Sequence, residues 1–388
     1  MIQRLLTPTP RESFFLFGAR GTGKSTWLEQ HFSRNTCLWL DLLDPDVEDR
    51  YLMNPKALEA EVDLLLEKGE KPAWVIIDEI QKAPRLLDIA HRLIERKRIR
   101  FALTGSSARK LKRGHANLLG GRAVVFNLFP FTHQELGENF NLSLALDWGT
   151  LPKIVAAQTP AERARLLRGY CQVYLKEEIL IEQLVRNLVP FKGFLEISAQ
   201  MDGKLINYEA IARNIHADNK TVQSYFDILE ETYLGSRLFP IHKSIRKSQK
   251  QAPKFYWFDS GVQRFLAGTI HSPLVPGTSA YGNAFESFVI NELTRFNSYR
   301  ELDYRFSYLQ TQHNAEIDLI LSRGHENIAI EIKSNQRIDP IEVRKLENLA
   351  CDLPNQTRVF YLSQDPSRQK IGKVNCLPWT EVFNELER

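Results

Sequence analysis

Residues 14–27 read FFLFGARGTGKSTW and contain the pattern that decides the fold of the N-terminal part of the chain. The segment Gly18–Ser25 fits the phosphate-loop pattern G-x-x-x-x-G-K-[ST] without a mismatch. An apolar run precedes this segment, and apolar residues at helical spacing (Trp27, Leu28, Phe32) follow it. A strand, a glycine-rich loop and a helix in this order predict an α/β domain with a nucleotide site behind its first strand.

Two kinds of phosphate contact are expected from this loop. Its glycines allow a tight turn, so that successive backbone N–H groups point inward and surround phosphate oxygens. Lys24 is expected to reach the β- and γ-phosphates of ATP, and the Ser25 hydroxyl to bind Mg²⁺. The predicted nucleotide-binding residues are Gly18, Ala19, Arg20, Gly21, Thr22, Gly23, Lys24, Ser25 and Thr26. The alternative is a glycine-rich turn that matches the pattern by chance.

Length and composition set the outer limits of the interpretation. A chain of 388 residues is too long for one core, so two to four domains are expected. No apolar run approaches the length of a membrane span, and the N-terminus lacks the apolar segment of a signal peptide. The four cysteines are scattered without a C-x-x-C pair, which favours a reducing cytoplasm. A net charge of +4 does not by itself indicate nucleic acid.

A second apolar run, AWVIIDE at residues 73–79, ends in two acidic residues. A strand that is apolar on both faces is typical of the centre of a parallel sheet. Asp78 is expected to hold Mg²⁺, and Glu79 to orient or deprotonate the water that attacks the γ-phosphate. Acidic residues often follow a strand, but at this distance behind a phosphate loop they favour ATP hydrolysis.

The next predicted strand begins at residue 100 and is followed by Ser106 and Ser107. Ring-forming ATPases hold a γ-phosphate sensor at such a position, and we expect Ser106 or Ser107 to serve; a simple turn is the alternative. The cation-rich segment 109–122 ends in Gly-Gly-Arg. Arg122 is the candidate for an arginine finger that completes a neighbouring subunit's site. A solvated basic loop is the competing interpretation.

The chain resembles the predicted AAA+ ATPases of bacteria and archaea known as the AAA_14/DUF4143 family. The resemblance rests on GARGTGKST, VIIDEIQKAP, LTGSSARKL and GGRAVVFNLFPFTHQE, and on the later LPKIV (151–155) and YLKEEILIEQ (174–183). It implies an α/β P-loop domain, then a winged helix and a restriction-endonuclease-like domain. We also expect self-association into a ring, a hexamer or heptamer. The biological role of the family is poorly defined.

Four parts are therefore predicted along the chain. Residues 1–135 form a P-loop AAA+ domain with a parallel sheet, and residues 136–200 a helical connector. Residues 201–272 form a winged helix-turn-helix, and residues 273–388 a PD-(D/E)XK nuclease-like α/β domain. The connector is expected to be helical because apolar residues recur at helical spacing between 161 and 184.

DNA contact is predicted for the winged-helix part. Residues 208–215 and 221–233 are expected to form two helices, followed by a strand over 234–241. The exposed side of the second helix, with Lys220 and Gln223, would face a DNA groove. The stretch 242–254 has five cations and no acid, which suits phosphate contacts that do not read sequence. Its predicted DNA-binding residues are Lys243, Arg246, Lys247 and Lys250. A protein-binding winged helix with a solvated basic loop is the alternative.

A metal-site pattern follows near the C-terminus. Asp318 precedes Glu331-x-Lys333 by thirteen residues, the signature of the PD-(D/E)XK nuclease-like fold, and Glu286 lies on a preceding predicted helix. Asp318 and Glu331, with the carbonyl of Ile332, are expected to bind one or two Mg²⁺ or Mn²⁺ ions, Glu286 to add a carboxylate, and Lys333 to activate water. Converging carboxylates without a cation would repel one another, so a metal is expected to compensate their charge.

Together these predictions favour an ATP- and Mg²⁺-dependent ATPase that acts on DNA, with a nuclease-like C-terminal domain. The alternative is a regulatory ATPase whose C-terminal half binds another protein and has an inactive nuclease fold. A nucleotide kinase with the same phosphate loop is disfavoured, because no acceptor-binding lid is evident and Asp78-Glu79 suits hydrolysis. The sequence leaves open the DNA structure, the ring size and the pathway.

Overall fold

The structure is a computed structural model, and its described residues fall into two compact units. The first unit consists of residues 1–137, 151–153 and 228–234, and the second of 138–150, 154–227 and 235–388. No helix among the described residues is both long and apolar enough to pass through a membrane. The described residues are 2–7, 11–107, 119–174, 188–241, 252–311, 315–351, 353 and 357–387.

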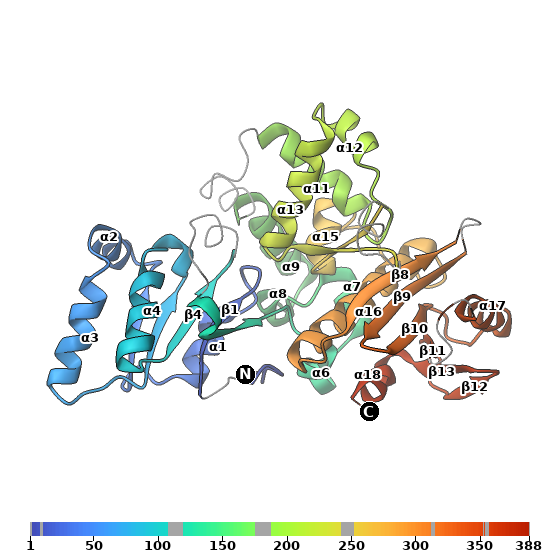
Figure 1. The fold of residues 1–388 in the computed structure, drawn as a ribbon. Coiled ribbons are helices and arrows are strands. Elements are labelled where there is room, and N and C mark those ends of the chain that lie inside the picture. The colour runs from blue at the N-terminus through green and yellow to red at the C-terminus, as the bar shows by residue number, and fades with distance from the viewer. Residues whose placement is uncertain are drawn as a thin grey trace. The chain divides into compact units, whose positions relative to one another are not determined.

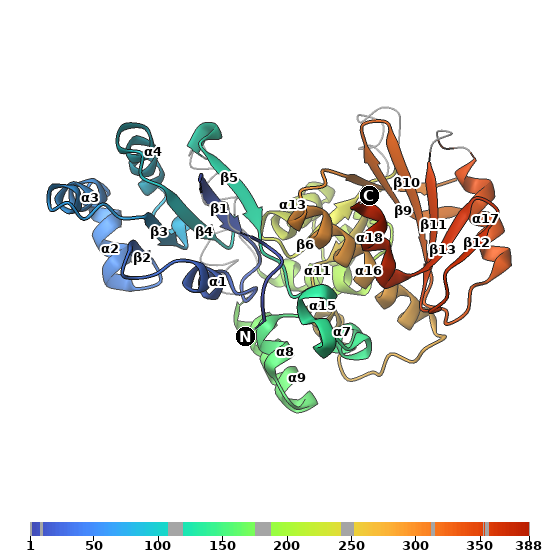
Figure 2. The same cartoon turned by 90° about the horizontal axis from the view of Figure 1, so that it is seen from below.

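A five-stranded parallel sheet forms the centre of the first unit (Figures 1 and 2). Its spatial order is β2-β3-β4-β1-β5, and every residue of β1, β3 and β4 is buried. Strands buried on both faces need the continuous apolar runs that the sequence has at these positions. The parallel α/β fold predicted from the phosphate loop is confirmed. The strands are β1 (Ser13–Phe17), β2 (Cys37–Asp41), β3 (Trp74–Asp78), β4 (Phe101–Gly105) and β5 (Ala123–Asn127).

The helices of this unit connect the parallel strands. β4 lies between β1 and β3, so the segments that follow these three strands emerge at one edge of the sheet. Side chains of α4, such as Leu86, Ala90 and Leu93, share a core with β1, β3 and β4. The helices are α1 (Lys24–His31), α2 (Pro45–Met53), α3 (Ala57–Glu67), α4 (Leu86–Lys97) and α6 (His133–Leu136).

Helices make up the N-terminal part of the second unit. Each of α7, α9, α12 and α15 begins behind an Asn, Thr or Asp side chain that accepts a backbone N–H of its first turn. The predicted helical region is confirmed. The helical pattern noted over residues 161–184 can be compared with the structure only as far as residue 174, because residues 175–187 lie outside the described part. The helices are α7 (Leu142–Trp148), α8 (Pro152–Ala156), α9 (Pro160–Gly169), the π-helix Tyr170–Tyr174, α11 (Leu188–Gln200), α12 (Tyr208–Asn214), α13 (Asn219–Glu231) and α15 (Ser260–Leu266).

A two-stranded antiparallel hairpin, β6 (Gly235–Leu238) and β7 (Lys254–Trp257), follows α13. The strand predicted over 234–241 is shorter, because the chain beyond Leu238 leaves β7 and turns to a neighbouring strand. The Ile241 N–H donates to the Tyr308 carbonyl over 2.7 Å, and the Tyr308 N–H to the Phe239 carbonyl over 3.1 Å. Tyr308 lies in the C-terminal sheet, so backbone hydrogen bonds attach the hairpin to that sheet.

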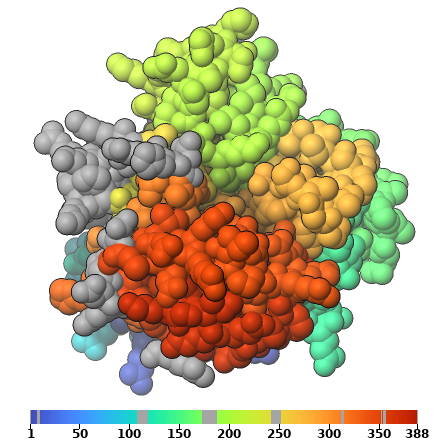
Figure 3. Space-filling model, turned by 90° about the vertical axis from the view of Figure 1, so that its right-hand side faces the viewer, coloured from blue at the N-terminus to red at the C-terminus, as the bar shows by residue number. Residues whose placement is uncertain are grey.

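The C-terminal part of the second unit is a six-stranded sheet with the order β12-β13-β11-β10-β9-β8. Neighbouring strands β8, β9 and β10 are antiparallel, whereas β11 runs parallel to β10 and to β13. In Figure 3 its orange to red residues form one continuous face. The elements are α16 (Ser279–Tyr299), β8 (Arg305–Gln310), β9 (Glu316–Arg323), β10 (Glu326–Ile332), α17 (Pro340–Ala350), β11 (Arg358–Ser363), β12 (Gln369–Ile371), β13 (Val374–Pro378) and α18 (Val382–Leu386).

Two separate cores hold this sheet. On one face, α16 packs through Phe285, Phe288 and Leu293 against side chains of β9 and β10. On the other face, α17 packs through Val343 and Leu346. Because successive strand residues face opposite sides, the same two strands feed both cores. The sheet is therefore covered on both faces. Because both covers are apolar, a charged side chain on β9 or β10 needs an oppositely charged or hydrogen-bonding partner, and such partners lie near the strand ends.

Candidate functional site

The phosphate loop closes around its own lysine. Lys24 is 5% exposed, and its Nζ donates to the Gly18 carbonyl over 2.9 Å and to the Ala19 carbonyl over 3.3 Å. A Cβ atom at Gly18 would lie 2.2 Å from the Leu128 carbonyl oxygen, so only glycine fits there. The loop thus holds Lys24 in the centre of the predicted phosphate site.

The rest of the loop leads directly into α1. Gly21 and Gly23 have φ values of 76° and 94°, a left-handed conformation that glycine adopts without strain. The Thr22 hydroxyl donates to the Ala19 carbonyl over 2.8 Å and braces the turn. Since α1 begins at Lys24, the N–H groups of its first turn have no helical acceptor and remain available to phosphate oxygens. The other predicted loop residues, Arg20, Ser25 and Thr26, are exposed.

The two predicted magnesium ligands of this unit are in contact. The Ser25 hydroxyl donates to Asp78 Oδ2 over 2.5 Å, and the Thr104 hydroxyl donates to Asp78 Oδ1. Burial raises the pKa of the Asp78 carboxyl, while the two hydroxyl donors act in the opposite direction. Thr104 was not among the predicted site residues, although it ends the strand that lies between β1 and β3.

Glu79 is held by side chains at the ends of β3 and β4. Its N–H donates to the Thr104 hydroxyl over 3.0 Å, and its backbone has a left-handed φ of 60°. The Gln81 side chain donates to Glu79 Oε2 and, over 3.2 Å, to Ser106 Oγ. The Ser106 hydroxyl lies 3.4 Å from Glu79 Oε2. The structure therefore brings the predicted water-activating acid and sensor together through Gln81; the alternative sensor, Ser107, is fully buried.

Gln81 is a residue that the sequence interpretation missed. It lies two positions after Glu79 in the short 3₁₀ turn Ile80–Lys82, and its side chain is buried. Its Oε1 atom has no hydrogen-bond partner among the described residues. A polar residue directly behind a strand-end Asp-Glu pair is the signal that would have identified it.

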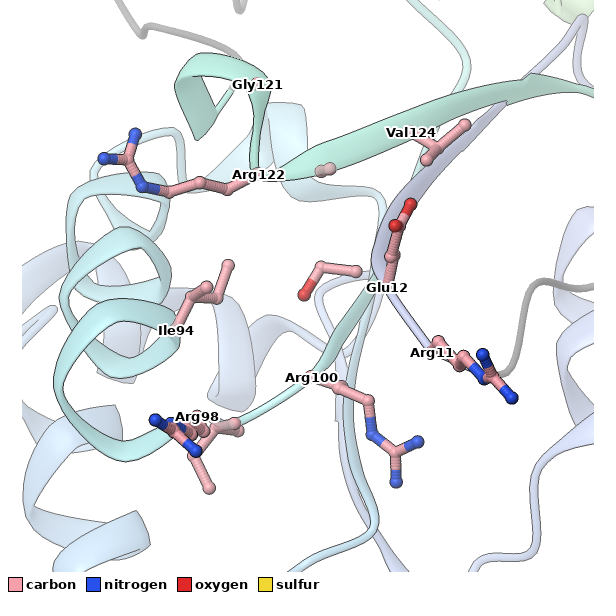
Figure 4. Close-up of a pocket in the computed structure, with 11 residues that line it drawn as sticks. Arg11, Glu12, Ile94, Arg98, Arg100, Gly121, Arg122 and Val124 are labelled. Atoms are coloured by element: carbon pink, nitrogen blue, oxygen red, sulfur yellow. The ribbon is translucent and has the colours of Figure 1, made fainter.

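Arg122 and the phosphate loop lie at opposite ends of the strands: Arg122 is beside the amino-terminal end of β1, and the loop follows its carboxyl-terminal end. Arg122 directly precedes β5, whose first residue pairs with Ser13 at the start of β1, whereas the loop follows the other end of β1. Five strand residues span about 16 Å. Arg122 is paired with Glu95 and lines a cavity of about 480 Å³ (Figure 4). Arg122 is therefore remote from its own chain's phosphate loop; residues 108–118 lie outside the described part.

The second candidate site lies where β9 and β10 meet. Asp318 Oδ2 accepts the Ile332 N–H over 2.8 Å, because the hairpin register sets β10 beside β9. Lys333 Nζ lies 2.5 Å from Glu331 Oε1 and 3.5 Å from Asp318 Oδ2. The structure thus brings three predicted residues of the PD-(D/E)XK pattern into one cluster.

The fourth predicted residue, Glu286 on α16, has partners of its own. The Tyr256 hydroxyl donates to Glu286 Oε1 over 2.9 Å, and Lys254 Nζ lies 3.5 Å from the same oxygen. Lys254 Nζ also contacts Glu316 Oε1. Lys254 belongs to the stretch predicted as an exposed basic wing, and that prediction is wrong for this residue, which is 5% exposed and paired with two carboxylates. Strand β7 carries it into the site.

The titration behaviour of this cluster follows from burial and crowded charge. Burial, together with the nearby Asp318 charge, raises the pKa of Glu286 to about 7 and that of Glu331 to about 8. Burial alone would lower the pKa of Lys333, but the Asp318 and Glu331 carboxylates outweigh it and hold that pKa above its ordinary value. Without a metal, Lys333 is therefore a stronger proton holder than a free lysine.

One atom of the cluster is suited to a cation. Glu331 Oε2 is buried and has no hydrogen-bond partner among the described residues. Carboxylate oxygens are the ligands that Mg²⁺ and Mn²⁺ prefer, so Asp318 and Glu331 fit such an ion. Within the described ranges, no three or more His, Cys, Asp or Glu side chains are gathered to hold one metal ion. Lys254 and Lys333 each place a side-chain cation beside these carboxylates.

The predicted DNA contacts divide into two groups. Lys220 and Gln223 are exposed near the start of α13, as a groove-facing helix requires. The predicted wing residues Lys243, Arg246, Lys247 and Lys250 lie outside the described residues. The exposed start of α13 is thus the described part of the predicted DNA surface.

Three family models match successive parts of the chain. Residues 10–137 match the model described as AAA domain (AAA_14), and residues 281–382 match the domain of unknown function DUF4143. The two families that the sequence resembles are therefore both matched, AAA_14 in the N-terminal part of the chain and DUF4143 in the C-terminal part. Residues 139–271 of this AAA_14/DUF4143 protein match a further domain of unknown function, DUF8612.

Similar proteins occur in bacteria and archaea. An uncharacterized protein of Mycobacterium tuberculosis is 25% identical over 302 residues, which cover 77% of this chain and 67% of the relative. An uncharacterized Haemophilus influenzae protein is 23% identical over 346 residues, or 82% of each chain. An uncharacterized Methanocaldococcus jannaschii protein is 23% identical and covers 90% of this chain and 81% of its own.

Among solved structures, Can2 from Sulfobacillus thermosulfidooxidans in complex with cyclic tetra-adenylate aligns with 97% of this AAA_14/DUF4143 chain and 98% of its own. The sequence identity is 10% and the TM-score 0.23. A Vibrio cholerae protein aligns with 97% of this chain and 96% of its own, at 12% identity and a TM-score of 0.22. We base no conclusion on similarities of this size.

Proposed function

We propose that this AAA_14/DUF4143 protein hydrolyses ATP with Mg²⁺ and uses the cycle to act on DNA. The observation that carries the ATPase part is the 2.5 Å contact between Ser25 and Asp78, with Lys24 and Glu79 at the same edge of the sheet. Phosphoryl transfer to water needs these four groups: a cation that binds the phosphates, two oxygen ligands for the metal ion and a base for the water.

Each residue has a distinct task in this reaction. Lys24 exchanges its carbonyl acceptors for the β- and γ-phosphate oxygens when ATP enters the loop. Ser25 and Asp78 would hold Mg²⁺, which neutralises charge that develops on the phosphates. Glu79 accepts a proton from the attacking water or orients that water toward the γ-phosphate. Ser106, next to Glu79, contacts the γ-phosphate.

Arg122 acts on a neighbouring subunit in this proposal. Its position about one strand length from its own phosphate loop supports a role in trans rather than in cis. A guanidinium that reaches the neighbour's γ-phosphate would stabilise the charge of the transition state. The active form is then a ring, a hexamer or heptamer, that works in the cytoplasm.

DNA is the proposed partner of the second unit. Helices α12 and α13, joined by a short turn and followed by the β6–β7 hairpin, support a winged helix whose exposed Lys220 and Gln223 face a groove. The predicted wing cations Lys243, Arg246, Lys247 and Lys250 would add contacts to phosphates.

The C-terminal cluster is proposed as a metal-dependent DNA nuclease site. Asp318 and Glu331 would hold Mg²⁺ or Mn²⁺, which supplies charge neutralisation at the scissile phosphate. Lys333, already within 2.5 Å of Glu331, positions the attacking water. Glu286 belongs to the same cluster through Lys254 and Tyr256.

A second candidate function is an ATP-dependent switch whose C-terminal domain binds a partner protein and cleaves nothing. The observation that favours it is that Lys333 lies against both Asp318 and Glu331 and neutralises charge that a metal would otherwise neutralise. In this candidate the cluster is a structural ion-pair network.

Two measurements on the full chain separate these candidates. The first is the rate of ATP hydrolysis with and without a panel of double-stranded, single-stranded and branched DNA. The second is cleavage of the same panel with Mg²⁺ or Mn²⁺, comparing wild type with Asp318→Ala, Lys333→Ala and the exposed control Lys370→Ala. DNA-stimulated hydrolysis, and cleavage lost only in the first two variants, is the expected result. Stimulation without cleavage by wild type would contradict the nuclease site and leave the action on DNA standing. The absence of both stimulation and cleavage would contradict the action on DNA and leave the switch.

A further inference from the structure

Lys254 joins the β6–β7 hairpin to the carboxylate cluster of the C-terminal sheet. Its Nζ contacts Glu316 Oε1 and lies 3.5 Å from Glu286 Oε1. Both carboxylates are partly covered, and the lysine side chain is 6% exposed. An ammonium buried this deeply loses much of its hydration and needs anionic partners in its place, so its position depends on these two acids.

The backbone around Lys254 sets this position in advance. Lys254 is the first residue of β7 and pairs with Leu238 across the hairpin and with Leu205 on its other side. Two residues earlier, the Ala252 carbonyl accepts the Tyr308 hydroxyl over 2.7 Å. Lys254 Nζ also lies 5.5 Å from the centre of the Tyr308 ring. Strand pairing on both sides and the hydrogen bond from Tyr308 fix the backbone at Lys254. The fixed backbone directs the Lys254 side chain toward the carboxylates.

The cluster therefore divides into two parts with different partners. In the first part, Asp318 and Glu331 face Lys333, and Glu331 Oε2 has no hydrogen-bond partner among the described residues. In the second part, Glu286 Oε1 already receives the Tyr256 hydroxyl and faces the Lys254 ammonium, which Glu316 shares. Within the part of the chain that the structure describes, only the first part offers a buried carboxylate oxygen without a hydrogen-bond partner.

We propose that Lys254 limits this site to a single divalent cation, held at Asp318 and Glu331. The Lys254 ammonium occupies the place at Glu286 and Glu316 that a second cation would take. Glu286 is then a positioning residue, anchored by Tyr256 and Lys254, rather than a metal ligand. This inference rests on the proposed metal site and adds its stoichiometry and the residue that sets it.

The charges of the cluster support this division. Four carboxylates (Glu286, Glu316, Asp318 and Glu331) meet two ammonium groups, which leaves a formal charge of −2 when all six groups are ionised. One divalent cation balances this charge. Removing the Lys254 ammonium adds one negative charge and frees two carboxylates for an ion.

The test is the number of Mn²⁺ ions bound per chain, measured by equilibrium dialysis of the full-length protein without nucleotide. We expect one ion for wild type, none for Asp318→Ala, and two for Lys254→Met. Lys254→Arg keeps the charge, and Lys370→Met removes an exposed lysine elsewhere in the same sheet; both should bind one ion.

Each outcome bears on a different claim. Two ions on wild type, or one ion on a folded Lys254→Met variant, would overturn the role of Lys254 and leave the metal site standing. No ion on wild type would overturn the proposed metal site, and this inference with it. The wild-type stoichiometry decides the matter even if Lys254→Met fails to fold.

Discussion

The Ser25 hydroxyl donates a 2.5 Å hydrogen bond to Asp78 Oδ2, and through this contact the first turn of α1 meets the end of β3. The two residues are 53 positions apart in the sequence. Their contact depends on the strand order, in which only β4 separates β1 from β3. Thr104 at the end of β4 donates to the other Asp78 oxygen, so α1 and β4 both contribute a hydroxyl to the carboxylate that ends β3.

Replacing the proposed base should separate nucleotide binding from turnover. Glu79→Gln keeps the size and hydrogen-bonding capacity of the side chain but removes the proton acceptor. We expect kcat for ATP hydrolysis to fall by at least about 10²-fold, with ATP affinity nearly unchanged. Steady-state hydrolysis and binding of a fluorescent ATP analogue measure the two quantities. Glu29→Gln on the exposed side of α1 is the control, and near-normal turnover by Glu79→Gln would remove Glu79 from the mechanism.

Gln81→Ala should lower kcat more than it changes KM. The variant releases Glu79 from its amide donor and breaks the link to Ser106. A misplaced base costs rate while the phosphate loop stays intact, so we expect kcat about tenfold lower and KM within about twofold. Gln200→Ala, an exposed glutamine on α11, is the matched control. Equal kcat values for Gln81→Ala and wild type would make Gln81 a packing residue.

Mixing two inactive variants tests whether sites are shared between subunits. Arg122→Ala and Lys24→Ala should each reduce ATP turnover by about 10³-fold or more. The first variant lacks the proposed arginine finger, and the second lacks the lysine that binds the phosphates. In a mixed ring, some sites pair an intact loop with an intact Arg122, so activity should return on mixing. Arg98→Ala, from the same cavity, should stay active alone. A mixture as inactive as its components contradicts a shared site.

The predicted wing residues should contribute salt-dependent DNA affinity. Exchanging Lys243, Arg246, Lys247 and Lys250 for Gln should reduce the log–log slope of affinity against salt by about three to four units. Fluorescence anisotropy with a labelled duplex at several salt concentrations measures the slope. The control removes four exposed cations of the C-terminal sheet domain instead (Arg344, Lys345, Lys370 and Lys373). An unchanged slope in the first variant would leave the wing as a solvated or partner-binding surface.

Asp202 predicts a pH-dependent stability. Burial raises its pKa to about 6, although the Trp257 N–H donates to it over 2.7 Å and Lys204 is nearby. A raised pKa means that its contribution to stability is complete below its unfolded pKa, near 4, and is lost as pH rises through about 6. Asp202→Asn should therefore raise the unfolding midpoint by roughly 5 °C at pH 8 and have little effect at pH 4. A gain of equal size at both pH values would contradict this account.

Local sequence patterns predicted the parallel fold of the first unit, because each of its two main motifs directly follows a buried strand. The loop Gly18–Ser25 and the pair Asp78-Glu79 each follow a buried strand, and the parallel order of the strands brings them to one edge. Gln81 escaped the prediction, because its one local signal is a polar residue two positions after Glu79, and that signal does not show that the side chain turns back to Glu79.

Prediction was poorer where contacts depend on a distant strand. Lys254 stands in a basic stretch, so its local composition indicates an exposed side chain. Its actual surroundings come from β8 and α16, which begin 25 or more residues later. The pairing of Phe239 and Ile241 with Tyr308 brings these elements together, and no periodicity within 234–254 announces it. The local sequence of a hairpin that is hydrogen-bonded to another sheet does not differ from the local sequence of a hairpin that is exposed on both edges.

The left-handed backbone at Glu79 sets thermal stability against the proposed chemistry. A non-glycine residue in this conformation costs on the order of 1 kcal/mol, which glycine would recover. A glycine at position 79 would therefore relieve this backbone strain and remove the proposed base in the same change. The backbone and the proposed task of this residue favour different amino acids.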